Sequence, residues 1–320
     1  MTSPLIEGTL GLVFPGQGSQ FVGMASKLAN ASIAARNVLT EANDILGFDL
    51  ADLMSSGPAD VLEDTHNAQP AILTASVAAH RAVVETAASR GRSFEPIIGA
   101  GHSLGEFTAL VAAGSLSFAD ALVLVRERGR LMKEAGNLAP GGMAAILGVD
   151  DARLAEICVE SSPLGVIVIA NANCPGQTVI SGEVAALERA MELAKAAGAK
   201  RALRLGVSIG AHSPLMAKAN GDFGGMIASV PVHDPAWPIV SNATAQMLSN
   251  AAEIRSELLA HMEGPVLWTQ TIQTMRGAGV TVLLELGPGA VLSGLAKRID
   301  RDLAIKGIGD PGIDLPVDTA

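Results

Sequence analysis

A serine flanked by glycines, in the segment GHSLGEF, is the first feature of the sequence that could do covalent chemistry. Ser103 lies in the pattern Gly-x-Ser-x-Gly, which is typical of a nucleophilic serine on a sharp turn between a strand and a helix. The turn would hold its hydroxyl above a sheet, where backbone N–H groups at the helix amino end face a developing negative charge. We therefore interpret Ser103 as a nucleophile; the alternative is a plain hydroxyl in a turn of small residues.

A nucleophilic serine requires a base, and one of the six histidines is well placed to serve. His212 lies in GAHSPLM, a loop that directly follows the predicted strand 202–209, so it can reach the end of another strand. No Asp or Glu stands out as its partner, but a backbone carbonyl can orient the ring, so a Ser–His dyad is admissible. The alternative is an ordinary hydrogen-bonded loop histidine. We expect His102 to point away from the serine, because it is next to it in the chain. The histidines without a comparable context are His66, His80, His102, His233 and His261.

A second glycine-containing loop, FPGQGSQ at residues 14–20, follows the first predicted strand. It is not a dinucleotide loop, because the third glycine of that fingerprint falls on Phe21, and the phosphate-binding pattern G-x-x-x-x-G-K-[ST] is absent. We interpret it as part of an oxyanion site, in which backbone N–H groups near Gln17 and at Leu104 would bind a tetrahedral oxygen. The alternative is a plain strand-to-helix turn.

An arginine lies where an apolar residue is expected, in the predicted helix at residues 118–134. When residues are placed about 100° apart, the apolar side chains of this helix gather within about 60° of Arg128. Burying an unpaired guanidinium costs several kcal/mol, so this side chain needs an anion. Two partners fit equally well at this point: a buried acid such as Glu285, or a substrate carboxylate held in the planar fork of the guanidinium.

The surrounding pattern indicates elements that would position these residues. A short apolar strand at 10–14, helices at about 24–46 and 71–88, a strand at 96–101 and a helix at 106–113 predict a mostly parallel sheet covered on both faces. A late buried strand begins at residue 281 and ends in a glycine turn.

The segment 138–208 has a different pattern from the rest of the chain. Its predicted elements are, in order, strand 143–149, helix 151–160, strand 165–171, strand 177–181, helix 183–197 and strand 200–207. The order βαββαβ is that of a ferredoxin-like fold. We therefore predict a small inserted subdomain of about 70 residues.

Composition limits the class of protein and its partners. The chain has 320 residues, of which 49% are hydrophobic and 17% charged, as in a globular protein of one large or two unequal domains. A net charge of −10 argues against nucleic acid or an anionic membrane as the main partner. No signal peptide or membrane-spanning segment is recognised, so we expect a cytoplasmic protein. Cys158 and Cys174 form no ligand cluster with histidine, so we expect buried thiols and no metal site.

Eight motifs appear in an order that matches one known family. They are FPGQGSQ, THNAQPAI, GHSLGEF, RGRLM, NCPGQTVISG, AHSPLM, GPVLWTQTI and LELGPGAVLSGL, and they extend from about residue 10 to residue 298. Each motif alone is weak, but the set is specific. Together they resemble the malonyl-CoA:acyl carrier protein transacylases of bacterial fatty acid synthesis.

The resemblance implies a fold and a reaction. It implies a large α/β-hydrolase-like domain, residues 1–137 and 209–320, with a parallel sheet, and an inserted ferredoxin-like subdomain, residues 138–208. The implied reaction is ping-pong transfer of malonyl from a coenzyme A thioester to the phosphopantetheine thiol of acyl carrier protein. It needs no metal or redox cofactor, and the family implies a monomer.

The resemblance also assigns roles to individual residues. In the family the serine of GHSLG is the nucleophile, the histidine of the late loop is the base and the arginine of RGRLM binds the malonyl carboxylate; backbone amides form the oxyanion hole, and a main-chain carbonyl near the P-V-x-W segment orients the histidine. Carried over to this sequence, these are Ser103, His212, Arg128, the amides of Gln17 and Leu104, and the carbonyl of Leu267 or a neighbour.

Several alternatives stay open at this stage. Service to a polyketide synthase or a malonate decarboxylase would use the same reaction, with another carrier. A serine esterase would explain the serine and the histidine but not Arg128, and a non-catalytic carrier-docking protein would need none of the three. The chain also has Gly210-Ala211 before the histidine, where family members often carry a bulkier pair, so selectivity for malonyl is less firmly implied than the reaction.

Overall fold

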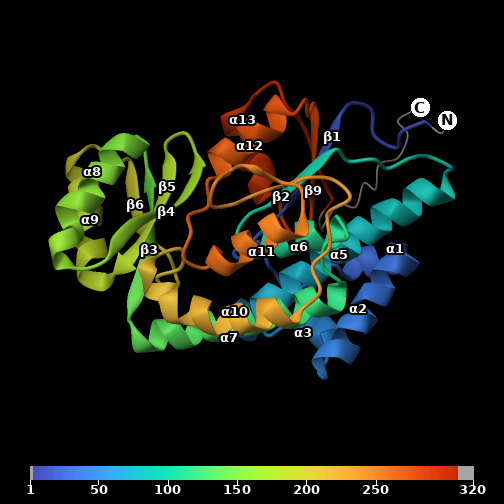
Figure 1. The fold of residues 1–320 in the computed structure, drawn as a ribbon, viewed down its shortest axis with the longest axis horizontal. Helices are drawn as coiled ribbons and strands as arrows, with labels where there is room; N and C mark the ends of the chain where they lie inside the picture. Colours follow the sequence, from blue (N-terminus) through green and yellow to red (C-terminus); the bar gives the residue numbers. More distant parts are fainter. Residues whose placement is uncertain (1–2, 309–320) are drawn as a thin grey trace.

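The computed structural model describes residues 3–308, and in this part of the chain two separate sheets form (Figure 1). The larger sheet has six strands in the order β10-β9-β1-β2-β7-β8. Adjacent strands run parallel except for β8, which is antiparallel to β7. The strands are β1 (Leu10–Phe14), β2 (Ile98–Gly101), β7 (Ile239–Val240), β8 (Met247–Leu248), β9 (Val282–Leu286) and β10 (Ala304–Ile308).

The central strands of this sheet are apolar on both faces, because helices cover both. All five residues of β1 are buried, and successive side chains alternate between two hydrophobic clusters. Leu12 and Phe14 pack in the cluster that contains helices α2, α5, α6 and α7, whereas Val13 packs with α12 and α13. The helices are α2 (Ile33–Leu46), α5 (Thr65–Ser89), α6 (Gly105–Ala112), α7 (Phe118–Leu138), α12 (Trp268–Gly277) and α13 (Val291–Ile299).

Two predicted helices differ from those observed. The helix expected at 24–46 is two helices, α1 (Ser26–Ala31) and α2, because Ser32 has an extended backbone and its side chain accepts a hydrogen bond from the amide of Ala35. The helix expected at 71–88 begins earlier, after Asp64, which caps the amide of His66. Short helices α3 (Leu50–Ser56) and α4 (Ala59–Glu63) connect these segments.

The second sheet has four antiparallel strands in the order β4-β5-β3-β6. Along the chain its elements are β3 (Gly141–Leu147), α8 (Asp151–Ser161), a 3₁₀ turn (Ser162–Leu164), β4 (Ile167–Cys174), β5 (Gln177–Glu183), α9 (Val184–Ala196) and β6 (Arg201–Arg204). Helices α8 and α9 bury one face of this sheet in a third hydrophobic cluster. The predicted order βαββαβ is therefore confirmed, with boundaries shifted by a few residues.

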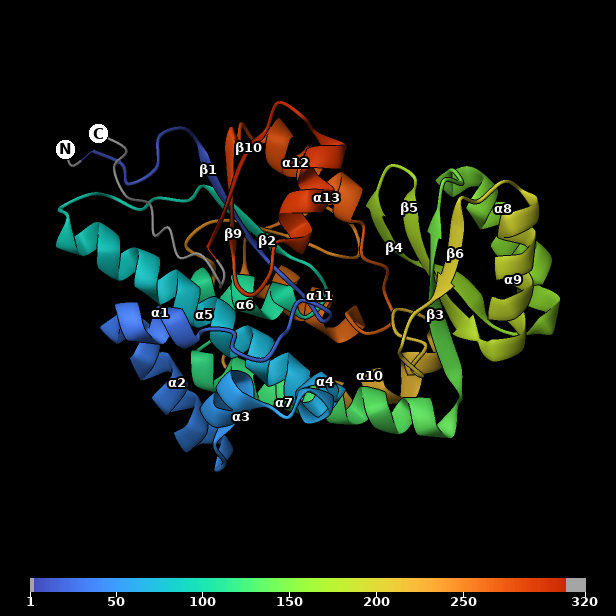
Figure 2. The same ribbon diagram turned by 180° about the vertical axis from the view of Figure 1, so that it is seen from behind.

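The two sheets are held together at several places. Helix α7 runs beneath the large sheet and leads directly into β3, as Figure 2 shows from behind. The chain then returns through a 3₁₀ turn (Pro214–Met216), α10 (Ala217–Ser229) and α11 (Ala251–Ala260), and α10 packs along α7. Just before α12, Val266 forms backbone hydrogen bonds with Ala170 and Ala172 of β4. The carboxyl ends of β1 and β2 thus face the small sheet across a cavity.

Within residues 3–308, no helix is both long and apolar enough to span a membrane.

Candidate active site

Ser103 sits on a sharp turn between β2 and α6. Its backbone φ is +50°, a left-handed conformation that is uncommon for a residue with a Cβ. The two flanking glycines are required by packing: a Cβ on Gly101 would lie 1.9 Å from the carbonyl carbon of Gly105, and a Cβ on Gly105 would lie 2.1 Å from the carbonyl oxygen of Phe14. The strained strand–turn–helix geometry expected of a nucleophile elbow is therefore present at Ser103.

Asn242 holds both sides of this turn. Its Oδ1 accepts a hydrogen bond from the Ser103 amide at 2.8 Å, and its Nδ2 donates to the Gly101 carbonyl at 2.8 Å. The residues around Asn242 in the chain do not predict this role. One signal could have found it: Asn242 follows β7, the strand beside β2, so both lie at the same edge of the parallel sheet.

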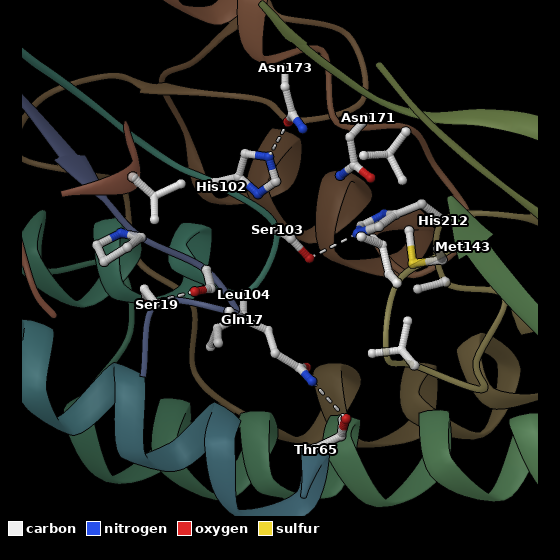
Figure 3. A pocket seen from close by; sticks show the side chains of 18 of the residues that line it. Gln17, Ser19, Thr65, His102, Ser103, Leu104, Met143, Asn171, Asn173 and His212 are labelled. Atoms are coloured by element: carbon white, nitrogen blue, oxygen red, sulfur yellow. Dashed lines mark hydrogen bonds between the residues drawn. The ribbon is translucent and has the colours of Figure 1, made fainter. Parts of the chain in front are cut away.

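Ser103 and His212 lie in direct contact, as Figure 3 shows. Ser103 Oγ is 2.8 Å from His212 Nε2, although 109 residues separate them in the chain. His212 Nδ1 is 2.8 Å from the carbonyl oxygen of Gly264, which can only accept, so Nδ1 carries the ring proton. Nε2 is then free to accept the serine proton. The pair has the geometry and tautomer that general-base activation of a hydroxyl requires.

The prediction of which backbone carbonyl orients the His212 ring is wrong. The carbonyl belongs to Gly264, three residues before Leu267, whereas Leu267 or a neighbour was expected in this role. Leu267 is the N-cap residue of α12, and its carbonyl accepts hydrogen bonds from the amide and hydroxyl of Thr271. That carbonyl is therefore used within the helix, whereas the carbonyl of Gly264 precedes the helix and is available to the ring.

Arg128 is buried, with 1% of its surface exposed, and its guanidinium reaches the serine. Nη2 lies 3.2 Å from Ser103 Oγ, and Nη1 donates to Gln69 Oε1 at 2.9 Å. Burial lowers the pKa of Arg128 to about 10, so it stays protonated at neutral pH. Among residues 3–308 no carboxylate forms an ion pair with it.

The acid considered as a structural partner of Arg128 is engaged elsewhere. Glu285 accepts hydrogen bonds from the amides of Leu292 and Ser293 and from the Ser293 hydroxyl, at the amino end of α13. It therefore caps a helix and does not neutralise the arginine. Glu106 acts on the guanidinium only through space, and no carboxylate among residues 3–308 contacts it directly.

The loop after β1 lies against the elbow, on the other side of the serine from the histidine. Gln17 donates from Nε2 to Thr65 Oγ1 at 2.9 Å, and the hydroxyl of Ser19 donates to the Gly16 carbonyl at 2.7 Å. Both contacts fix the loop, and Gln17 lines the same cavity as Leu104. In the described part of the chain, the backbone N–H groups of Gln17 and Leu104 donate to no other group.

A cavity of about 480 Å³ lies between the two sheets, and it is lined by Ser103, His212 and Arg128 together with Gln17 and Leu104. Its far wall is formed largely by the small sheet and the segment after it, including Met143, Val179 and Val207. His102 points away from the serine, as expected, and its Nε2 lies 2.8 Å from Asn173 Oδ1 on β4 (Figure 3). The cavity is large enough for a small acyl group with part of a thioester arm. No cluster of three or more metal-ligating side chains occurs among residues 3–308.

The contact between Ser103 and His212 predicts how the reactivity of Ser103 toward an acyl donor depends on pH. Burial, and next the nearby charge of Arg128, hold the pKa of His212 well below 6.5. A base works in its neutral form, which predominates above its pKa. We expect the rate of Ser103 acylation, measured by stopped flow, to stay constant as the pH is lowered from about 7 to about 5.5. A rate that halves near pH 6.5, the ordinary histidine value, would contradict this account of the base.

The sequence of this chain is similar to those of known acyltransferases. Residues 12–302 match the family model described as an acyl transferase domain. The chain is 44% identical over 299 residues to the malonyl CoA-acyl carrier protein transacylase of Salmonella typhimurium, covering 93% of this chain and 95% of that protein.

Solved structures of similar proteins have the same fold as this chain. An acyl-carrier-protein S-malonyltransferase from Burkholderia pseudomallei has a TM-score of 0.88 at 45% identity, covering 95% of this chain and 97% of that one. A malonyl-transacylase solved in complex with the acyl carrier protein of a type II polyketide synthase has a TM-score of 0.89 at 40% identity, covering 95% of this chain and 96% of that one.

Proposed function

The chain belongs to the acyl transferase family, and from this premise we propose that it transfers malonyl from malonyl-CoA to the phosphopantetheine thiol of acyl carrier protein. Its relatives of 44% identity carry the name of this activity. Supply of malonyl groups to fatty acid synthesis is the role that fits these relatives. The same reaction with a polyketide carrier is the second candidate, since one similar structure holds such a carrier.

In the first half-reaction, Ser103 Oγ attacks the thioester carbonyl while His212 Nε2 takes its proton, over the 2.8 Å contact that joins them. The backbone amides of Gln17 and Leu104 stabilise the tetrahedral oxyanion. The carbon–sulfur bond then breaks, and the imidazolium returns the proton to the leaving thiolate. The products are free coenzyme A and a malonyl ester of Ser103.

Arg128 selects the acyl group. A malonyl ester on Ser103 places its free carboxylate within reach of a guanidinium whose Nη2 lies 3.2 Å from the ester oxygen. A planar guanidinium binds a carboxylate through two parallel hydrogen bonds, which are about twice as strong as neutral ones. The single observation that carries the proposal is this buried arginine, which lies beside a Ser–His pair and has no ion-paired acid among residues 3–308.

The second half-reaction reverses the first. His212 removes the proton of the pantetheine thiol, the thiolate attacks the ester, and the proton passes to Ser103 Oγ as the carbon–oxygen bond breaks. Every proton transfer uses His212, and every charge that develops faces a backbone amide or Arg128. The chemistry described here uses only groups of this chain and its two substrates.

We also infer the finer features of fold and state. The strand order β4-β5-β3-β6 with two helices on one face supports a ferredoxin-like subdomain at residues 138–208. The parallel sheet with a strand–turn–helix at Ser103 supports an α/β-hydrolase-like domain at 1–137 and 209–320. A monomer in the cytoplasm, acting without a cofactor and binding neither nucleic acid nor membrane, completes the proposal.

A serine esterase is the rival of another reaction class, and turnover without an acceptor separates the two. With malonyl-CoA alone, we expect a burst of about one equivalent of coenzyme A and then a slow phase, because the ester waits for a thiol. Adding a phosphopantetheine thiol should raise the steady-state rate of coenzyme A release by about a hundredfold or more over the slow phase. Continuous release of free malonate at the same rate with and without the thiol would identify a hydrolase.

A further inference from the structure

Behind Arg128 lies a pair of buried titratable residues that the mechanism does not use. His261 follows α11 and is 2% exposed, and Glu106 on α6 is fully buried. His261 Nδ1 lies 3.4 Å from Arg128 Nη2, and His261 Nε2 lies 3.6 Å from Glu106 Oε2. Nothing near His261 in the chain points to Arg128, so its role was not predicted from the sequence.

The contacts determine which nitrogen of His261 carries its proton. The guanidinium has donors only, so Nδ1 must accept, and the ring proton of the neutral imidazole lies on Nε2, facing Glu106. Burial and the charge of Arg128 lower the pKa of His261 to about 3, so the ring stays neutral. The ring therefore meets the guanidinium through one nitrogen and the carboxyl group through the other.

Glu106 is the acid that would otherwise neutralise Arg128. Its Oε2 accepts hydrogen bonds from the side chain and the amide of Asn242, while its Oε1 has no partner among the described residues. Burial raises the pKa of Glu106 to about 8, and the positive charge of Arg128 acts against this shift. Direct contact between a guanidinium and a carboxyl group with an unpaired oxygen would be strongly attractive in a buried site, where the dielectric constant is low.

We propose that His261 is a positioning residue that holds the Arg128 guanidinium toward Ser103 and separates it from Glu106, so that the cation remains available to the acyl carboxylate. This inference rests on the proposed malonyl transfer. The remaining neighbours of His261 do not compete for Arg128: Phe107 packs edge-on at 5.3 Å, the ring of His212 lies 6.3 Å away, and Glu257 bonds to Ser241 and Ala243.

Four variants separate the possibilities, three of them single substitutions of His261. Gln in place of His261 can accept from Arg128 and donate to Glu106, so it should preserve the arrangement. Ala removes both contacts and opens a path for the guanidinium to reach Glu106. Combining His261→Ala with Glu106→Gln removes the acid that could ionise against Arg128, so the guanidinium should again be available to substrate. His261→Met, which fills the space but offers no nitrogen to Arg128 or Glu106, serves where the alanine variant unfolds.

The test is the ratio of kcat/KM for Ser103 acylation by malonyl-CoA to that by acetyl-CoA, which has no carboxylate. In His261→Ala, and likewise in His261→Met, we expect this ratio to fall about tenfold to a hundredfold. Only the kcat/KM for malonyl-CoA should fall, because only malonyl has a carboxylate that forms charge-assisted hydrogen bonds with Arg128. Acylation by acetyl-CoA should change less than about threefold. His261→Gln should keep the ratio, and the double variant should recover most of it.

Three results would overturn the inference: an unchanged ratio in His261→Ala and His261→Met, an equal loss for both acyl groups, or no recovery in the double variant. Equal loss is what a purely structural role would give. Wild-type protein that malonyl-CoA does not acylate would instead overturn the proposed function itself, so the two failures are distinguishable.

Discussion

Replacing Ser103 by alanine is expected to abolish the covalent acyl-enzyme and to lower malonyl transfer by a factor on the order of 10⁵ to 10⁶. The oxygen that would carry the acyl group is removed, and His212 at 2.8 Å loses the group that it activates. The measurement is steady-state transfer from malonyl-CoA to a phosphopantetheine thiol. Alanine is smaller and tolerates the turn no worse than serine, so the fold should be retained.

A matched control tests whether the effect belongs to this serine. Ser229→Ala, on an exposed position of α10, should leave transfer within about twofold of wild type, as for most surface substitutions. Transfer by Ser103→Ala above one hundredth of the wild-type rate, with thermal unfolding unchanged, would show that another group receives the acyl chain.

Replacing Arg128 by methionine is expected to lower the malonyl-to-acetyl ratio of kcat/KM by about a hundredfold or more. The substitution removes a two-pronged, charge-assisted contact to the malonyl carboxylate, worth about 3 kcal/mol at two hydrogen bonds to a charged group. Acetyl has no carboxylate to lose. Methionine fills most of the buried volume, so cavity formation should contribute little.

Arg130 is the matched control for this prediction. It lies on the same helix but is half exposed, where it pairs with Glu127 and Glu134. Arg130→Met should leave the ratio within about twofold, because exposed ion pairs contribute little. A ratio that stays unchanged in Arg128→Met would remove the carboxylate clamp from the account, whatever happened to the total rate.

Features that depend on local sequence were predictable. The elbow at Ser103 needs glycines at fixed positions because backbone atoms approach within 2.1 Å of where a Cβ would be, and that requirement is visible as a motif. Arg128 was identifiable because helical periodicity placed a charge among apolar residues that must be buried. The alternation of strands and helices gave both sheets, since burial on one or two faces leaves its own pattern.

Features that depend on distant contacts were not predictable from the chain alone. Gly264, which orients His212, and Asn242, which clamps the elbow, act through a carbonyl and an amide that many residues could supply. Leu267 was carried over from the family's P-V-x-W segment, and only the folded chain shows that the carbonyl three residues earlier, that of Gly264, meets the ring. His261 meets Arg128 across 133 residues, and only the packing of α6, α7 and α11 brings them together.

The most direct test of the central claim is mass spectrometry of the intact protein after mixing with malonyl-CoA, followed by peptide mapping. We predict a mass increase of one malonyl group, carried only by the peptide that contains Ser103, that persists in buffer and disappears when a pantetheine thiol is added. Label on another residue, or label that water removes as fast as the thiol does, would contradict the account.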